Sequence, residues 1–208
     1  MAASARKRPY NDLFFIKRRP RLRGIPLEWE RPADEDAFQK LIDQEGFVSR
    51  KYWSGGDLTE KYPTVAQDTK DLDQYLLPSF FEFSQKSKYY QNAFYLYQWV
   101  FALGAFFTTL FGTLAAMIGL GRADYSVELG QLLSYLTAIV GAITAYYTTL
   151  SNRGEPQKRW GKTRRLAEEL RMNYFRYLAH LPPFDKDDRV QKLRQTVIDI
   201  RVKEQENG

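Results

Sequence analysis

The 208-residue chain contains no cysteine and a single histidine, His180. Without cysteine it can form no disulfide, no thiolate metal site and no thiol nucleophile, and one histidine cannot build a multi-histidine metal centre. No acid–base pair or nucleophile stands near His180 in the sequence. These absences predict a protein that is not an enzyme and that binds no metal or cofactor.

Charge is also missing, but only locally. The chain has 31 Lys and Arg and 25 Asp and Glu, yet residues 89–121 and 129–152 contain none of these four types. Both segments are rich in Phe, Leu, Ala and Ile, and apolar stretches of about 20 residues are typical of helices that cross a bilayer. The averaged composition is that of a soluble protein, but these two segments predict membrane spans.

The spans are best placed at about 99–120 and 129–150. At 1.5 Å per residue each would reach roughly 33 Å, close to the hydrocarbon thickness of about 30 Å. Both must be helical, because a lone pair of strands would leave backbone groups unpaired in lipid. The connection, residues 121–128, is short and predicts an antiparallel hairpin. The alternative is a helical hairpin buried in a soluble protein.

The basic residues near the span ends predict the orientation. The connection carries only Arg122 against Asp124 and Glu128, whereas the outer ends of both spans are basic. The basic residues at those outer ends are Lys86, Lys88, Arg153, Lys158, Arg159, Lys162, Arg164 and Arg165. The positive-inside rule then predicts a multi-pass protein of the cell (inner) membrane with both termini in the cytoplasm. Residues 1–20 lack the apolar core of a secretory signal.

Small residues follow one side of each span. On the second span, Ser134, Thr137, Gly141, Thr144 and Thr148 fall within one narrow stripe of a helical wheel. These hydroxyls could line a pore, or they could bond to carbonyls of their own helix while the small side chains allow close packing. On the first span a packing seam with 4-3-4-3 spacing is predicted, formed by Ala105, Thr109, Gly112, Ala116 and Gly119. Two helices cannot enclose a lumen, so a pore would require a homo-oligomer.

Residues 1–33 are basic and rich in proline, with Tyr10, Phe14 and Phe15 among the charges. Anionic lipid headgroups or a partner protein could bind such an arm, and a plain disordered tail is the third interpretation. No motif in the chain supports binding of nucleic acid.

Four helices are predicted outside the spans. Residues 34–45 form a short helix that Gly46 ends, and Thr64–Gln67 reads as a capping box that starts a stalk leading into the first span. Pro78 should kink or restart that stalk, and Pro156 should open an amphipathic helix that ends before Pro182. Asp185 is predicted to cap a last helix, whose apolar stripe could form a coiled coil or pack against the stalk.

The predicted fold class is therefore an all-α membrane protein, built on a two-span antiparallel hairpin with a helical stalk and C-terminal amphipathic helices. The predicted domains are a basic N-terminal region (1–63), the two-span domain (64–181) and a C-terminal helix (182–208).

The segment after the second span reads Trp160-Gly-Lys-Thr-Arg164-Arg-Leu-Ala-Glu168-Glu-Leu170-Arg. Together with the preceding stalk and spans, it resembles the SLATT family, two-transmembrane effector domains associated with SMODS nucleotidyltransferases and SLOG proteins. The resemblance covers about residues 64–181 and rests on Trp160, Arg164, Glu168 and Leu170. The chain departs from the usual family pattern at Thr163 and Asn173. The resemblance implies an effector that oligomerises and permeabilises membranes when a nucleotide-signalled immunity system is triggered.

Two functions follow as hypotheses. The first is an oligomeric two-span protein that acts as a pore-forming or channel-like effector. The second is a non-conducting membrane anchor or scaffold that recruits a partner through residues 1–33.

Overall fold

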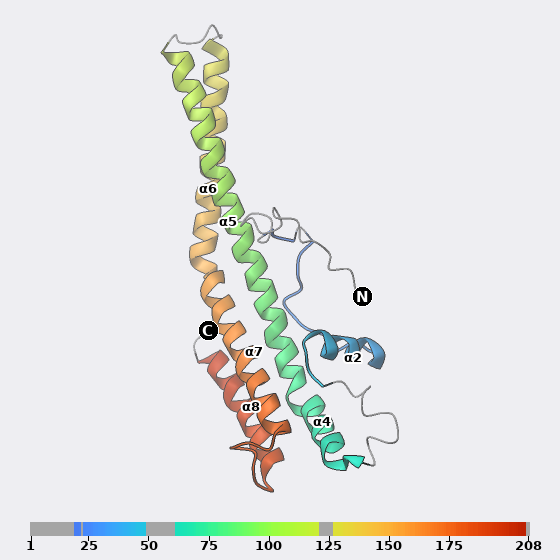
Figure 1. Cartoon of the computed structure of the whole chain (residues 1–208). Coiled ribbons are helices and arrows are strands. Elements are labelled where there is room, and N and C mark those ends of the chain that lie inside the picture. Colours follow the sequence, from blue (N-terminus) through green and yellow to red (C-terminus); the bar gives the residue numbers. More distant parts are fainter. Residues whose placement is uncertain (1–18, 22, 49–60, 121–126, 207–208) are drawn as a thin grey trace, which may run out of the picture. The chain divides into compact units, whose positions relative to one another are not determined.

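The computed structural model describes residues 19–21, 23–48, 61–120 and 127–206, and the regular structure of this part of the chain is helical. Figure 1 shows the order of the helices in this part of the chain. They are α2 (Glu35–Gln44), α4 (Pro63–Tyr75), α5 (Leu77–Gly119), α6 (Val127–Gly154), α7 (Pro156–Leu178) and α8 (Arg189–Gln205). The predicted all-α fold is confirmed for the described residues.

The chain divides into two compact units, and each is built from two separate stretches of sequence. The first, called the hairpin unit, comprises residues 1–25 and 90–158, and the second, called the helical unit, comprises residues 26–89 and 159–208. Helix α5 contributes its first residues to the helical unit and the remainder to the hairpin unit.

Two helical stretches, Leu77–Gly119 and Glu128–Leu178, are long and apolar enough to cross a membrane. Only 6% and 0% of their most apolar windows are buried, whereas the core helix of a soluble protein would be mostly buried. The prediction of two helices that could span a membrane is thus confirmed by their length and composition.

Helix α2 forms as the sequence predicts. Asp34 is its N-cap and accepts a hydrogen bond from the backbone N–H of Asp36. Gly46 follows the helix with φ of +79°, a left-handed conformation that glycine adopts without a steric cost. Phe38 and Ile42 are fully buried on the inner face.

Pro156 and Pro78 also act as predicted. Helix α7 begins at Pro156, and Pro78 stands at the start of α5, directly after α4 ends at Tyr75. Proline fits the first helical turn because the N–H it lacks has no partner there.

Two of the predicted helix starts are wrong. Helix α4 begins at Pro63 without any side-chain cap, so Thr64 already lies inside the first turn and closes no capping box. Helix α8 begins at Arg189, after Asp188, and not at Asp185. The reason for the later start is Phe184, whose N–H bonds to the Leu181 carbonyl and whose ring is fully buried beside Tyr177.

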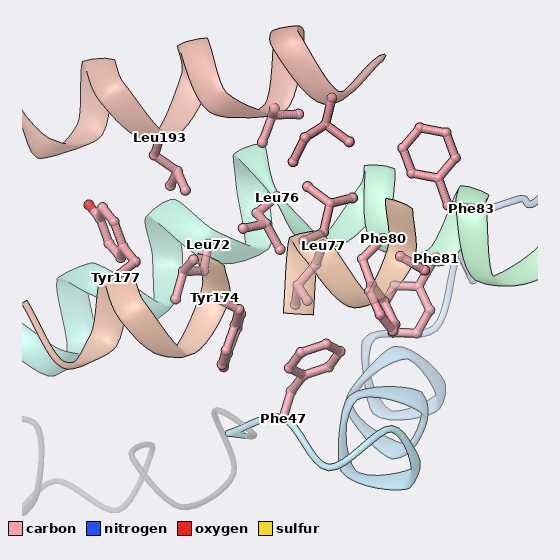
Figure 2. Packing of buried hydrophobic residues seen from close by; sticks show 14 of the residues in the cluster. Phe47, Leu72, Leu76, Leu77, Phe80, Phe81, Phe83, Tyr174, Tyr177 and Leu193 are labelled. Carbon is pink, nitrogen blue, oxygen red and sulfur yellow. The ribbon is translucent and has the colours of Figure 1, made fainter. Parts of the chain in front are cut away.

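The core of the helical unit lies between α4, the first turns of α5, α7 and α8 (Figure 2). Its largest side chains are aromatic, and Phe80 packs edge-on against Phe47, which in turn contacts Tyr174. The apolar stripe of α8, formed by Leu193, Val197 and Ile200, is buried in this core. Of the two interpretations of that stripe, the structure shows packing within the chain, and the stripe is not available for a coiled coil.

Candidate functional site: a membrane hairpin

Helices α5 and α6 lie side by side as an antiparallel pair (Figure 1). Gly104 lies against the Thr144 side chain, and Gly130 lies against Ile118. Gly104 and Ile118 are 14 residues apart, as are Gly130 and Thr144, so the two helices run past each other without a shift in register. Tyr97 and Tyr147 continue the contact, with ring centroids 6.1 Å apart.

The residues in these contacts can be continued along both helices at alternating three- and four-residue spacing, the repeat of a left-handed helix pair, and the positions reached in this way are buried or partly buried. We call these residues the contact line. On α5 and α6, respectively, they are Tyr97, Phe101, Gly104, Thr108, Phe111, Ala115 and Ile118, and Gly130, Leu133, Thr137, Val140, Thr144, Tyr147 and Ser151.

Every hydroxyl of the stripe predicted on the second span bonds to its own helix. Ser134 donates to the Gly130 carbonyl and Thr137 to that of Leu133, at 2.9 and 2.8 Å. Likewise, Thr144 donates to the Val140 carbonyl at 2.8 Å and Thr148 to the Thr144 carbonyl at 2.9 Å. The donors therefore need no water, as expected for hydroxyls that serve packing.

The stripe divides into an inner and an outer part. Thr137, Gly141 and Thr144 are partly buried on the side of α6 near α5, whereas Ser134 and Thr148 are exposed. Of the stripe residues, Ser134 and Thr148 are therefore the ones whose side chains are fully accessible within a single chain.

The seam predicted on the first span is not the surface that contacts α6. Its members Ala105, Thr109, Ala116 and Gly119 are exposed, and Gly112 has no side chain within 4 Å of where a Cβ would stand. The contact line runs beside the seam, because Gly104 is where the backbone of α5 comes close enough to touch Thr144. The seam is therefore left without a partner inside the hairpin.

Small and bulky residues lie on opposite sides of the hairpin. On a helical wheel with 3.6 residues per turn, the exposed small residues of each helix occupy a sector of roughly 100° directly beside the contact line. Viewed from the N-terminus of its own helix, this sector lies on the same side of the contact line in α5 and in α6. Since the helices are antiparallel, these two sectors face the same side, which we call the small face. Its members are the exposed residues Ala102, Ala105, Thr109, Thr113 and Ala116 and the partly buried Gly112 of α5, with the exposed residues Ser134, Ala138, Ala142, Ala145 and Thr149 of α6.

The opposite side, called the bulky face, is covered by large apolar side chains. Its members are Leu103, Phe106, Phe107, Leu110, Leu114 and Met117 of α5 with Leu132, Ile139, Ile143 and Tyr146 of α6. The exposed fractions of these side chains range from 37% for Phe107 to 62% for Tyr146. The hairpin thus has one side suited to lipid chains and one suited to another helix.

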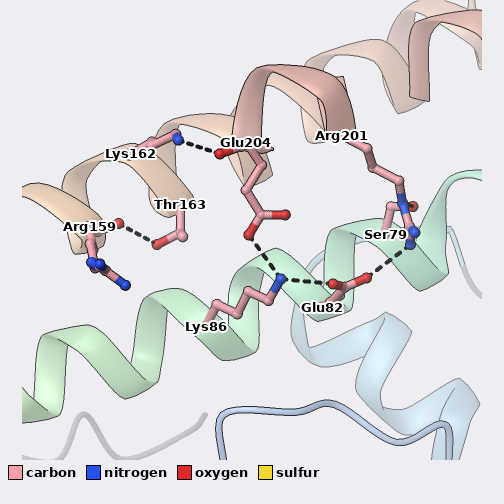
Figure 3. A network of polar contacts seen from close by, with 8 residues as sticks. All are labelled: Ser79, Glu82, Lys86, Arg159, Lys162, Thr163, Arg201 and Glu204. Carbon is pink, nitrogen blue, oxygen red and sulfur yellow. Dashed lines mark hydrogen bonds and ion pairs between the residues drawn. The ribbon is translucent and has the colours of Figure 1, made fainter. Parts of the chain in front are cut away.

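A polar network in the helical unit joins α5, α7 and α8 (Figure 3). Lys86 lies between the carboxylates of Glu82 and Glu204, at 2.9 and 2.8 Å. Arg201 bonds to Glu82 and to the Ser79 hydroxyl, and Lys162 donates to the Glu204 carbonyl. Partial burial lowers the pKa of Lys86, but its two carboxylate partners outweigh burial and hold the pKa above the ordinary value.

The residues of the family-like motif have different roles in the helical unit. Leu170 is fully buried in the core and Trp160 is partly buried, whereas Arg164 is exposed. Glu168 pairs with Arg171 at 3.3 Å, not with Arg164 four residues before it. Arg171 also pairs with Glu45 at 2.9 Å.

A buried ion pair that the sequence did not indicate fastens the end of α7 and the start of α8 to α4. Asp68 is fully buried and pairs with Arg189 at 2.6 Å, while His180 Nε2 lies 2.8 Å from the same carboxylate. Nearby, the Tyr177 hydroxyl donates to Asp71. Burial and the adjacent carboxylates raise the pKa of Tyr177, so it remains a neutral donor. Sequence alone offers little sign of this cluster, since its residues are spread over three helical segments.

The part of the chain that the structure describes contains no group of three His, Asp or Glu side chains placed to hold a metal ion. The basic residues of the N-terminal arm before Arg19 lie outside the described residues, as does most of the connection between the spans.

An all-helical fold with two long, exposed apolar helices defines a candidate two-span membrane protein. The chain belongs to the family described as a protein of unknown function, DUF4231, whose family model matches residues 81–192. The matched range includes most of α5, all of α6 and α7 and the start of α8. No curated protein and no solved structure matches the chain.

Proposed function

We propose that this chain is an oligomeric two-span protein of the cell membrane that forms or gates a pore, with both termini in the cytoplasm. The observation that carries the proposal is the small face of the hairpin, on which exposed small residues of α5 and α6 stand side by side. The SLATT-like motif around Trp160 and Arg164 supports the further proposal that the pore serves a membrane effector.

Lipid chains provide no hydrophobic force that would bring transmembrane helices together, so association depends on close packing. Small side chains allow the backbones of two helices to approach, and Gly112 has free space where a Cβ would stand. We infer that the small face binds further copies of the chain and that the bulky face contacts lipid. Several copies are needed, because two helices cannot surround a lumen.

One exposed hydroxyl of the stripe lies outside the small face and is therefore free to face such a lumen. This is Thr148, whose oxygen retains acceptor capacity although its hydrogen is used within the helix. Thr144, which lies against Gly104, and the partly buried Thr137 are assigned to packing within the hairpin. This narrows the pore-lining hypothesis to Thr148.

Conductance measured in planar bilayers tests the proposal. The wild-type protein should conduct, and Gly112→Leu should lower the assembled, conducting fraction about tenfold, which corresponds to about 1.4 kcal/mol per contact. Thr148→Leu, a change outside the small face, should lower single-channel conductance while the oligomer persists. Ile139→Leu, a conservative change on the bulky face, serves as the matched control and should leave both quantities unchanged.

The alternative function is that of a membrane scaffold that recruits a partner through residues 1–33. It is favoured by the complete bonding of the stripe hydroxyls within α6, which leaves no donor for water. Absence of conductance from every oligomeric form of the wild type would contradict the pore. Deletion of residues 1–33 that abolishes partner recruitment but preserves oligomers would then support the scaffold.

A further inference from the structure

A side-chain amide on α5 holds the backbone of the N-terminal arm. Asn92 Oδ1 accepts a hydrogen bond from the Arg21 N–H at 2.6 Å, and Asn92 Nδ2 donates to the Arg21 carbonyl at 3.3 Å. One amide thus satisfies both backbone groups of a residue that has no regular secondary structure. Two bonds to one residue fix the position of the arm along α5 better than contacts of its flexible side chains would.

We call the two hydrogen bonds between Asn92 and Arg21 the clasp. The clasp places three arginines close to the start of the first span. Arg19, Arg21 and Arg23 are all exposed. Asn92 precedes Trp99, the predicted edge of the span, by seven residues, or roughly 10 Å along the helix. The interfacial layer adds about 5–7 Å on each side of the hydrocarbon core, and an arginine side chain can extend toward it.

The second span brings basic side chains to the same end of the hairpin. Arg153 follows the predicted end of that span, Leu150, by three residues and is exposed, and Lys158 lies further along the chain. Among the described residues of the hairpin unit, Glu155 is the acidic residue at this end, and it is paired with Lys158 at 3.0 Å. Arg19, Arg21, Arg23 and Arg153 form no ion pair with a described residue. We call these four arginines the basic collar.

We propose that the basic collar binds the headgroups of anionic phospholipids, and that Asn92 is the residue that positions the arm for this binding. The proposal rests on the proposed function in one respect, namely that the hairpin crosses the bilayer. Guanidinium groups that pair with no described acidic residue, and that lie beside α5 and on α6 at one end of the hairpin, suit phosphate oxygens, which accept bidentate hydrogen bonds from arginine. Each basic residue near an anionic leaflet strengthens binding about fivefold, equivalent to about 1 kcal/mol.

The test is a titration of the purified full-length protein in neutral detergent with phosphatidylglycerol or phosphatidylcholine. Bound lipid stabilises the folded protein by RT ln(1 + [lipid]/Kd), so the apparent Kd of each lipid follows from how the midpoint of thermal unfolding rises with lipid concentration. The wild type should bind phosphatidylglycerol at least tenfold more tightly than phosphatidylcholine. Replacing Arg19, Arg21 and Arg23 together by glutamine should remove most of this preference.

Asn92→Ala separates positioning from charge, because it leaves all four arginines in place. We expect it to weaken phosphatidylglycerol binding at least threefold without changing that of phosphatidylcholine. Gln131→Ala, which removes an exposed amide at the other end of the hairpin, is the matched control and should change neither.

Equal affinity of the wild type for the two lipids would overturn the proposal, and an unchanged Asn92→Ala variant would overturn the role of the clasp. If the arginine variant retains its lipid preference but loses a co-purified acidic protein, the collar belongs to a protein partner and the lipid proposal fails. The lipid titration needs no conductance, so a non-conducting protein that prefers phosphatidylglycerol would refute the pore and leave the collar standing. Failure of the wild type to insert into vesicles would instead refute the proposed function.

Discussion

Replacing Gly104 by leucine should disrupt the α5–α6 hairpin and lower its free energy of unfolding by about 3 kcal/mol, the upper range for an overpacked site. Even a single Cβ at this position would overlap the Thr144 Oγ1 and approach the Thr144 Cβ to 3.3 Å. Rotation of Thr144 cannot relieve the second contact, and the rest of a leucine side chain needs more room than a small shift provides, so the helices must separate. Denaturant unfolding in detergent micelles, followed by loss of helical circular dichroism, measures the change.

The neighbouring glycines provide the control for Gly104. Gly112→Ala and Gly141→Ala introduce a Cβ into space that is free within the chain, so neither should destabilise the hairpin. Shortening the partner should rescue the defect, and Thr144→Gly combined with Gly104→Ala should show a coupling energy of at least about 1 kcal/mol. A Gly104→Leu variant as stable as the Gly112→Ala variant would show that the two helices do not meet along the contact line.

Replacing Phe80 by alanine should destabilise the helical unit by about 3–5 kcal/mol, the range for loss of a buried aromatic side chain. The Phe80 ring is only 2% exposed, and it packs against Phe47 and Phe81 while the Arg171 guanidinium lies 5.2 Å from its centroid. Its removal leaves a cavity between α5 and α7 that the surrounding helices cannot close. Thermal unfolding of the full-length protein measures the loss.

Phe175 is the matched control because it is also a phenylalanine that contacts Phe47, but it is 45% exposed. Phe175→Ala should therefore cost less than about 1 kcal/mol. Equal losses for the two variants would mean that the cluster around Phe80 is not the core of this unit.

The existence and type of the helices could be predicted from the sequence, because each carries a clear periodic pattern. The predicted starts of α4 and α8 failed, since local signals at Thr64 and Asp185 compete with tertiary packing. Burial of Phe184 keeps residues 181–188 in turns, and no pattern within those residues predicts that.

Which side of each span faces the other helix was harder to predict than the existence of the spans. The predicted seam at Ala105, Thr109 and Gly112 and the observed contact line at Gly104, Thr108 and Phe111 have the same spacing and differ by a single residue. Small residues suit contacts within a hairpin and contacts between copies equally well. Periodicity alone therefore finds both surfaces but cannot assign each to its partner.

Disulfide crosslinking between copies tests most directly the central claim that hairpins associate through the small face. The chain contains no cysteine, so each single-cysteine variant can be oxidised in membranes without background. Cysteines at Thr109 and Ala138, on the small face, should form crosslinked dimers, whereas cysteines at Leu110 and Ile139, on the bulky face, should remain monomeric. Crosslinks confined to the bulky-face positions, or none at any position, would contradict the account.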